Sequence, residues 1–194
     1  ELVGRKIENF TLEDYRGRAR SLSDWSDAKL IVVAFLGTEC PLATLYAPRL
    51  SELAARYADR GVTLIGIDSN QQDSITEVAA YAQRYGVSFP ILKDPANQLA
   101  DRFGATRTPQ IFVLDGERRA RYVGRIDDQY GVGVHKPKAL RNDLAEALDE
   151  LLQDYHDSED LHPAVVLQAD TKQIRAYRRG GEVVHEGHQR RGGE

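Results

Sequence analysis

Two uninterrupted apolar runs with a helix-like segment between them constrain most strongly what this 194-residue chain can fold into. Residues 30–36 and 62–68 read as strands buried on both faces, because apolar side chains fill nearly every position instead of alternating with polar ones. Residues 41–60 carry leucine and tyrosine side chains near helical spacing, with Pro41 in the first turn and Gly61 after the last. This strand–helix–strand order predicts an α/β fold.

The segments on either side continue the alternation of strands and helices. We expect an N-terminal hairpin (7–12 with 18–22), a helix capped by Ser74 and Glu77, a strand over 87–92, a helix over 96–103, a hairpin (110–114 with 119–126) and a helix over 137–152. A central mixed sheet with helices on both faces accommodates that order. We therefore assign residues 1–152 to one domain and residues 153–194 to a C-terminal extension composed of a linker, a small hairpin and a flexible tail.

Composition excludes several classes of function. A net charge of −4 provides no basic surface for nucleic acid or for an anionic membrane. No apolar run approaches the roughly 20 residues that a membrane-spanning helix needs. The chain has 1 cysteine, which excludes an internal disulfide, an internal two-cysteine redox couple and a metal site built on several cysteines.

That cysteine, Cys40, lies where the first buried strand gives way to the helix that opens with Pro41. A thiol at a helix N-terminus faces unpaired backbone N–H groups and the positive end of the helix dipole, and both favour the thiolate. The thiolate is the form that attacks disulfides and peroxides. Because free cysteine is also among the most buried residue types, an inert core side chain is the alternative interpretation.

Four segments carry a resemblance to a known family. They are 35–41 (FLGTECP), 94–104, 106–115 (TRTPQIFVLD) and 122–128 (YVGRIDD). With the order of elements, they make residues 1–152 similar to the thioredoxin-like superfamily, and within it to the redoxin branch of alkyl hydroperoxide reductase, thiol-specific antioxidant proteins and membrane-associated thiol–disulfide oxidoreductases. The resemblance implies a thiol-based oxidoreductase without cofactor or metal. It also implies an external thiol as reductant, and a protein disulfide or a small peroxide as substrate.

The resemblance implies the site residues as well. Cys40 is the nucleophile, and Thr108 and Pro109 are joined by a cis peptide bond that packs beside it and leaves the preceding backbone free to pair with an extended substrate. The residues assigned to substrate binding are Thr38, Glu39, Pro41, Arg107 and Arg125. His135 could approach the thiol as a base or a copper ligand, but copper-chaperone relatives combine their histidine with two cysteines.

The chain departs from the family pattern around the cysteine. Ala43 occupies the position of the second cysteine of a Cys-x-x-Cys pair, so an outside thiol must release any mixed disulfide. Ala34 replaces the buried acid of thioredoxins. Gly37 stands where peroxiredoxins place threonine, and Pro109 falls where they place an arginine. We therefore expect disulfide exchange in preference to peroxide reduction, with either of two arginines, at positions 107 and 125, as a substitute for the missing one.

Two further interpretations accompany this hypothesis. A redox-inactive binding or assembly domain on the same fold is the alternative function. Asp127 and Asp128 precede a turn-rich loop and are interpreted as solvated. The chain begins at Glu1 instead of Met, and from this and from where relatives work we expect export, to the periplasm of a bacterium.

Overall fold

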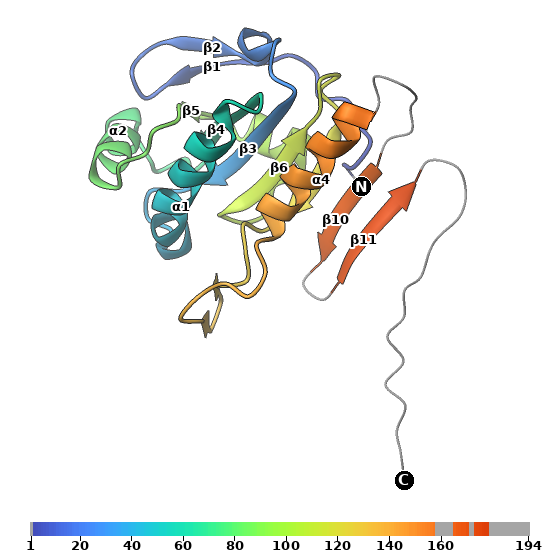
Figure 1. Ribbon diagram of the computed structural model, residues 1–194. Coiled ribbons are helices and arrows are strands. Elements are labelled where there is room, and N and C mark those ends of the chain that lie inside the picture. The colour runs from blue at the N-terminus through green and yellow to red at the C-terminus, as the bar shows by residue number, and fades with distance from the viewer. Residues whose placement is uncertain (1, 158–164, 171–172, 179–194) are drawn as a thin grey trace.

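The two apolar runs form neighbouring parallel strands in the middle of the sheet. In the computed structural model, which describes residues 2–157, 165–170 and 173–178, β3 (Leu30–Leu36) pairs with β4 (Val62–Asp68) along its whole length. Helix α1 (Pro41–Ala58) connects them and packs on one face. The order of the strands in the described sheet is β11-β10-β7-β6-β3-β4-β5-β1-β2 (Figure 1).

The sheet is mixed, as the order of elements predicted. Strand β5 (Ile91–Lys93) runs parallel to β4, whereas β6 (Gln110–Leu114) runs antiparallel to β3. The other strands are β1 (Thr11–Asp14), β2 (Ala19–Ser21), β7 (Ala120–Gly124), β10 (Val165–Asp170) and β11 (Gln173–Arg178), with β8 (Tyr130–Gly131) and β9 (Val134–His135) forming a separate hairpin. The other helices are the 3-10 helix η1 (Leu22–Trp25), α2 (Ile75–Arg84), α3 (Gln98–Phe103) and α4 (Asp143–Asp157).

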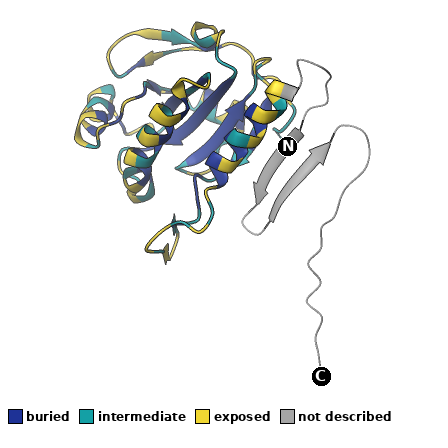
Figure 2. Ribbon diagram, in the orientation of Figure 1, coloured by how far each residue is buried: buried dark blue, intermediate teal, exposed yellow. Residues whose placement is uncertain are grey.

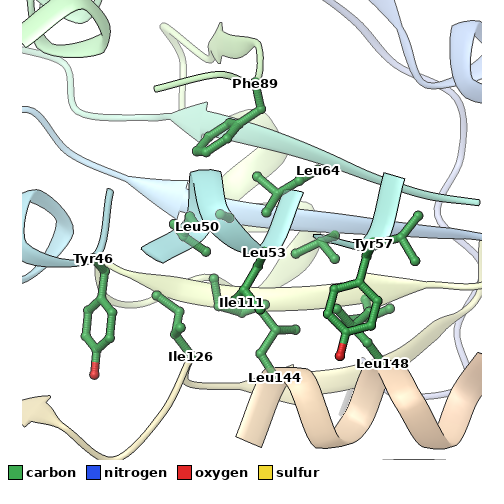
Figure 3. Close-up of a cluster of buried hydrophobic side chains, with 14 of the residues drawn as sticks. Tyr46, Leu50, Leu53, Tyr57, Leu64, Phe89, Ile111, Ile126, Leu144 and Leu148 are labelled. Carbon is green, nitrogen blue, oxygen red and sulfur yellow. The ribbon is translucent and has the colours of Figure 1, made fainter. Parts of the chain in front are cut away.

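Both faces of the sheet bury apolar side chains along its central strands β3, β4 and β6, which are dark blue in Figure 2. On one face, leucine and tyrosine side chains of α1 meet those of α4 (Figure 3). There the Tyr57 hydroxyl donates to the Ala145 carbonyl oxygen at 3.2 Å. On the other face, the rings of Phe35, Phe103 and Phe112 pack edge to face, with centroids 5.1–5.5 Å apart. This double burial holds the carboxyl end of β3 in a fixed position.

Three predicted elements are wrong in extent by more than two residues at one end. The first strand of the N-terminal hairpin, expected over 7–12, is β1 and begins at Thr11. The last helix begins at Asp143 and not at Pro137, because the Asp128 carboxylate accepts hydrogen bonds from the Leu140 and Arg141 backbone nitrogens and holds the preceding segment as a loop. Leu140 is accordingly 71% exposed and does not belong to the buried face. The strand expected over 87–92 shortens to β5, since the Val87 nitrogen still donates to the end of α2.

The hairpin expected in the C-terminal extension is present as β10 and β11, and β10 pairs in parallel with β7 at the edge of the sheet. The linker and the tail lie outside the described residues, and the domain boundary at residue 152 stays a prediction. None of the helices in the described part of the chain has the length and apolarity needed to cross a bilayer.

Candidate active site

Cys40 is the N-cap residue of α1, at the point where β3 ends. Its backbone is extended, Pro41 follows in the first helical turn, and the Ala43 backbone nitrogen donates to Cys40 Sγ at 3.5 Å. The thiol is half-buried and packs against the core under α1. The sulfur therefore takes the place of the capping oxygen, as the sequence predicted, while part of the residue remains accessible.

The Thr108–Pro109 bond is cis and lies beside this thiol. Strand register explains the contact, since Gln110 opens β6 opposite Phe35 of β3 and the two preceding residues reach the end of β3. Cys40 Sγ donates to the Thr108 carbonyl oxygen at 3.1 Å. The thiol thus has a backbone acceptor for its proton and a backbone donor, Ala43 N–H, for its lone pair.

A buried polar group on the opposite side of the turn holds its backbone. The Thr38 nitrogen donates to Asp73 Oδ2 at 2.9 Å, and the Cys40 nitrogen donates to the Gly37 oxygen at 3.2 Å. A Cβ atom on Gly37 would lie 2.4 Å from Asn70 Nδ2, so the amide of Asn70 fills the space that a larger side chain would need. The sequence analysis missed Asn70 and Asp73, although their position just after a buried strand that neighbours the cysteine strand was a usable signal.

The residues predicted to bind substrate do not all gather at the thiol. Thr38 lies in the turn beside Cys40, while Glu39 and Pro41 are exposed neighbours of Cys40. Arg107 is exposed next to Thr108. The Arg125 guanidinium instead donates to the buried Asp143 carboxylate at 2.6 Å, at the start of α4. The role of these five residues in substrate binding stays a prediction.

The departures from the family pattern are buried. Ala43 is 0% exposed, and its carbonyl oxygen accepts a hydrogen bond from the Tyr81 hydroxyl at 2.9 Å. Ala34 is also fully buried, in the middle of β3. The position next to the thiol where a second cysteine would stand therefore exists, but it carries a methyl group.

Asp127 is buried, so its interpretation as a solvated carboxylate is wrong. It accepts from the Tyr46 hydroxyl at 2.6 Å and from Arg49 Nη1 at 2.5 Å. Burial, followed by the hydrogen bond to Asp127, raises the pKa of Tyr46. These contacts attach the β8–β9 hairpin to α1, because the Tyr130 nitrogen also donates to the Tyr46 hydroxyl.

His135 is exposed on this hairpin, where its ring meets the edge of Tyr130 with centroids 5.0 Å apart. Within the described residues, no three histidine, cysteine, aspartate or glutamate side chains come together as a metal site would require. Figure 1 shows the hairpin projecting beyond the end of the sheet at which α1 begins.

A cysteine capping the first long helix, beside a cis-proline that precedes an antiparallel strand, defines a protein of thioredoxin fold with a thiol site. The sequence matches the AhpC/TSA family over residues 3–123, and the chain belongs to that family. A second match, to the penicillin-binding protein OB-like domain over residues 132–186, covers a smaller part of the chain, and within it α4 packs on the thioredoxin-like sheet.

Relatives and solved structures agree with this membership. The chain is 29% identical over 129 residues to thiol-disulfide oxidoreductase ResA of Halalkalibacterium halodurans, covering 66% of this chain and 72% of that protein. It is similar to the crystal structure of a hypothetical protein from Sinorhizobium meliloti 1021, with TM-score 0.71, 32% identity and coverage of 78% and 84%. A putative thiol:disulfide interchange protein DsbE from Chlorobium tepidum shares the fold, with TM-score 0.64, 18% identity and coverage of 77% and 97%.

Proposed function

We propose that this protein is a thiol–disulfide oxidoreductase that works with one cysteine and an external thiol. The observation that carries the proposal is the position of Cys40 Sγ, which lies 3.1 Å from the carbonyl oxygen before the cis-proline and within reach of the Ala43 N–H. The name of the ResA relative supports the same reaction class.

The reaction proceeds in two exchanges. The Cys40 thiolate attacks one sulfur of a substrate disulfide, so that the substrate S–S bond breaks, a Cys40–substrate disulfide forms and one substrate thiolate leaves. Since Ala43 supplies no second thiol, an external thiolate then attacks the substrate sulfur of the mixed disulfide. That second exchange restores the Cys40 thiolate and joins the external thiol to the substrate sulfur in a new disulfide.

The residues near the thiol favour disulfide exchange over peroxide reduction, because they differ from the threonine and arginine that peroxiredoxins use. Asn70 occupies the space beside Gly37, where the threonine of peroxiredoxins would need room for its side chain. The Arg125 guanidinium is paired with Asp143. Gly37 therefore supplies no hydroxyl and the Arg125 Nε–H is directed to Asp143, which leaves Arg107 as the arginine that could polarise a bound peroxide.

The exposed apolar side chains at this end of the molecule favour a polypeptide as the substrate. Leu45 of α1 is 46% exposed, and Val132 at the tip of the β8–β9 hairpin is 97% exposed. We expect Val132→Asp to slow the reduction of a protein disulfide while leaving the reduction of a small aromatic disulfide unchanged. Equal effects on both substrates would remove the hairpin from substrate binding.

Steady-state reduction of a protein disulfide by an added dithiol tests the proposal, with Cys40→Ser as the control. We expect the wild-type protein to accelerate the reaction at least about tenfold over the control, which is ~1.4 kcal/mol of barrier. Equal rates for the two proteins would instead support the alternative function, a redox-inactive binding or assembly domain. Export to the periplasm of a bacterium belongs to the same proposal, and cell fractionation tests it.

The variant Ala43→Cys sharpens the claim about the external thiol. A cysteine at this buried position lies next to Cys40 Sγ and can attack the mixed disulfide internally. We expect the variant to release the second substrate thiol without added reductant, whereas the wild-type protein retains its mixed disulfide. Release by the wild-type protein alone would contradict the one-cysteine mechanism.

A further inference from the structure

A group of four polar side chains, two of them buried carboxyl groups, lies behind the turn that carries Cys40. It consists of Asp68 at the end of β4, Asn70 and Asp73 in the following loop and Lys93 at the end of β5, and we call it the Asp68 network. Asp68 is 1% and Asp73 3% exposed. Lys93 Nζ donates to Asp68 Oδ1 at 2.6 Å, and Asn70 Nδ2 donates to Asp73 Oδ2 at 3.1 Å.

This network holds the cysteine turn directly. Asp73 Oδ2 accepts the Thr38 N–H at 2.9 Å, two residues before the thiol. The Asn70 amide lies so close to Gly37 that a Cβ atom there would be 2.4 Å from Asn70 Nδ2, so a side chain at position 37 would have to displace the amide. Register adds a third connection, because Asp68 is the residue of β4 that pairs with Leu36, the last residue of β3.

The network has two carboxyl groups and one ammonium group. Burial, together with a hydrogen bond to Asp73, raises the pKa of Asp68 to about 7 against the opposing effect of Lys93. Burial also acts to raise the pKa of Asp73, but hydrogen bonds from Thr38, Asp68 and Asn70 bring it below its ordinary value. Near neutral pH, the two adjacent carboxyl groups therefore share one proton, which is bound mainly by Asp68.

Other titratable groups face this pair from the neighbouring elements. Glu77, in the first turn of α2, interacts with Asp73 and Lys93, and it caps its own helix through Ser74. Tyr81, also on α2, interacts with both Asp68 and Cys40, so these two groups lie within electrostatic range of one side chain. Burial raises the pKa of Tyr81, so its hydroxyl stays neutral in the range where Asp68 titrates.

We propose that Asp68 and Asp73 are positioning residues for Cys40, and that the proton they share is coupled to the ionisation of its thiol. With the proton in place, the pair carries one negative charge that Lys93 balances. Loss of the proton to solvent adds a negative charge behind the turn, which opposes a second negative charge on Cys40 Sγ. The inference deepens the proposed function, because it concerns the same thiol and assigns the groups that set when this thiol reacts.

The test is the rate of Cys40 alkylation by iodoacetamide from about pH 5 to about pH 9. Coupled ionisations produce two steps in such a profile, so we expect two for the wild-type protein. Asp68→Asn removes the shared proton and should give a single step, with alkylation roughly three- to tenfold faster at the pH of the wild-type second step. A single step in the wild-type protein, or two steps in Asp68→Asn, would overturn the proposal.

Asp94→Asn is the matched control. Asp94 is a buried carboxyl at the end of the next strand, but it accepts from Ser69 Oγ at 2.9 Å and caps α3 through the Leu99 nitrogen at 3.0 Å, away from the cysteine turn. We expect this variant to retain both steps. A single step in the control would show that the second step does not belong to the Asp68 network, and would also overturn the proposal.

Asp73→Ala and Asp73→Asn separate positioning from charge. The alanine variant loses the acceptor of the Thr38 N–H, and we expect slower alkylation across the pH range. The asparagine variant keeps an acceptor and loses the charge, so we expect a single step without the general slowing. Wild-type rates in Asp73→Ala would overturn the positioning role.

The alkylation rate measures the reactivity of the Cys40 thiol without any disulfide substrate, so this test is independent of the proposed function. A protein that alkylates in two steps but does not accelerate disulfide reduction would contradict the proposed function and support the inference. A protein that accelerates disulfide reduction but alkylates in one step would support the proposed function and contradict the inference.

Discussion

Two buried acidic groups flank α1, and they differ in how their charges are balanced. Asp127 pairs with Arg49 at 2.5 Å and accepts from the Tyr46 hydroxyl and the Gln129 backbone nitrogen, so one carboxylate meets one cation and two neutral donors. Asp68 pairs with Lys93 at 2.6 Å and also interacts with a second carboxyl group, Asp73, so these three groups carry a net negative charge when both acids are ionised.

The difference separates a structural ion pair from a proton-binding site. A buried carboxylate with its own cation and hydrogen-bond donors fixes two segments together. A buried carboxyl that also faces a second acid retains its proton up to neutral pH, where it can respond to a nearby reaction. The protein thus uses buried aspartates for attachment at the β8–β9 hairpin and, by our proposal, for control at the cysteine turn.

The largest expected effect is on the attachment side of this comparison. Asp127→Ala leaves Arg49 and the Tyr46 hydroxyl without their acceptor, and since Arg49 is 33% exposed we expect a loss of about 2–3 kcal/mol in the free energy of unfolding instead of the full penalty of a buried charge. Urea unfolding measures it. Glu52→Ala removes the weak, exposed contact of Arg49 at 3.9 Å and serves as the control, with an expected change within about 0.5 kcal/mol. If Asp127→Ala loses no more stability than the control, the claim that Asp127 is a structural ion-pair partner is wrong.

The second prediction concerns the pH dependence of stability. Because the pKa of Asp68 is raised in the folded protein to about 7, the folded state binds this proton more tightly than the unfolded state. Its contribution to stability is therefore complete below the ordinary aspartate range and is lost as the pH rises toward 7, with a slope of at most ~1.4 kcal/mol per pH unit. Urea unfolding at several pH values should show this slope in the wild-type protein and in Asp127→Asn, and a reduced slope in Asp68→Asn. The same slope in the wild-type protein and in both variants would show that a group other than Asp68 binds this proton.

The third prediction tests the contact between the Asp68 network and the cysteine turn. Gly37→Ala sets a methyl group against Asn70 Nδ2 and displaces that amide from Asp73, for an expected cost of about 1–2 kcal/mol. Asn70→Ala removes the obstacle, so the double variant should lose less than the sum of the two single variants. Additive losses would mean that the two residues do not interact.

The smallest expected effect comes from Asp128, beside Asp127 in sequence. The hydrogen bond from Lys136, followed by those from the Arg141 and Leu140 nitrogens, lowers the pKa of Asp128. Its stabilising contribution is thus present above the ordinary aspartate range and declines as the pH falls through the lowered value. Asp128→Ala should cost about 1 kcal/mol at neutral pH and weaken the protection of residues 136–142 against proteolysis. Unchanged proteolysis would show that this loop is held by other contacts.

Much of the architecture could be predicted from local patterns. The runs at 30–36 and 62–68 specify buried strands by composition alone, and Ser74 with Glu77 specifies the start of α2 through a capping box that the structure contains. The thiol at the first turn of α1 follows from the same local signals. These features depend on neighbours within a few positions, which is why sequence reasoning reaches them.

The rest depends on contacts between distant segments. Asp73 accepts the Thr38 N–H across 35 positions, and Asp127 reaches Tyr46 across 81. Adjacent acids in a polar stretch usually lie in solvent. Burial of Asp127 depends on two distant donors, Tyr46 and Arg49, which lie three residues apart on one face of α1 and both bind its carboxylate. The late start of α4 has the same origin, since a carboxylate outside the segment holds the loop before it.

The most direct test of the one-cysteine mechanism is the intact mass of the protein after reaction with a single equivalent of an oxidised peptide joined by one intermolecular disulfide. The mechanism predicts rapid release of one peptide thiol and, on quenching with acid, one peptide bound through Cys40, an adduct that only a thiol in solution can remove because the chain holds no second thiol. If no adduct forms faster than on a short unstructured peptide that contains one cysteine, Cys40 is not a working nucleophile and the account of this site is wrong.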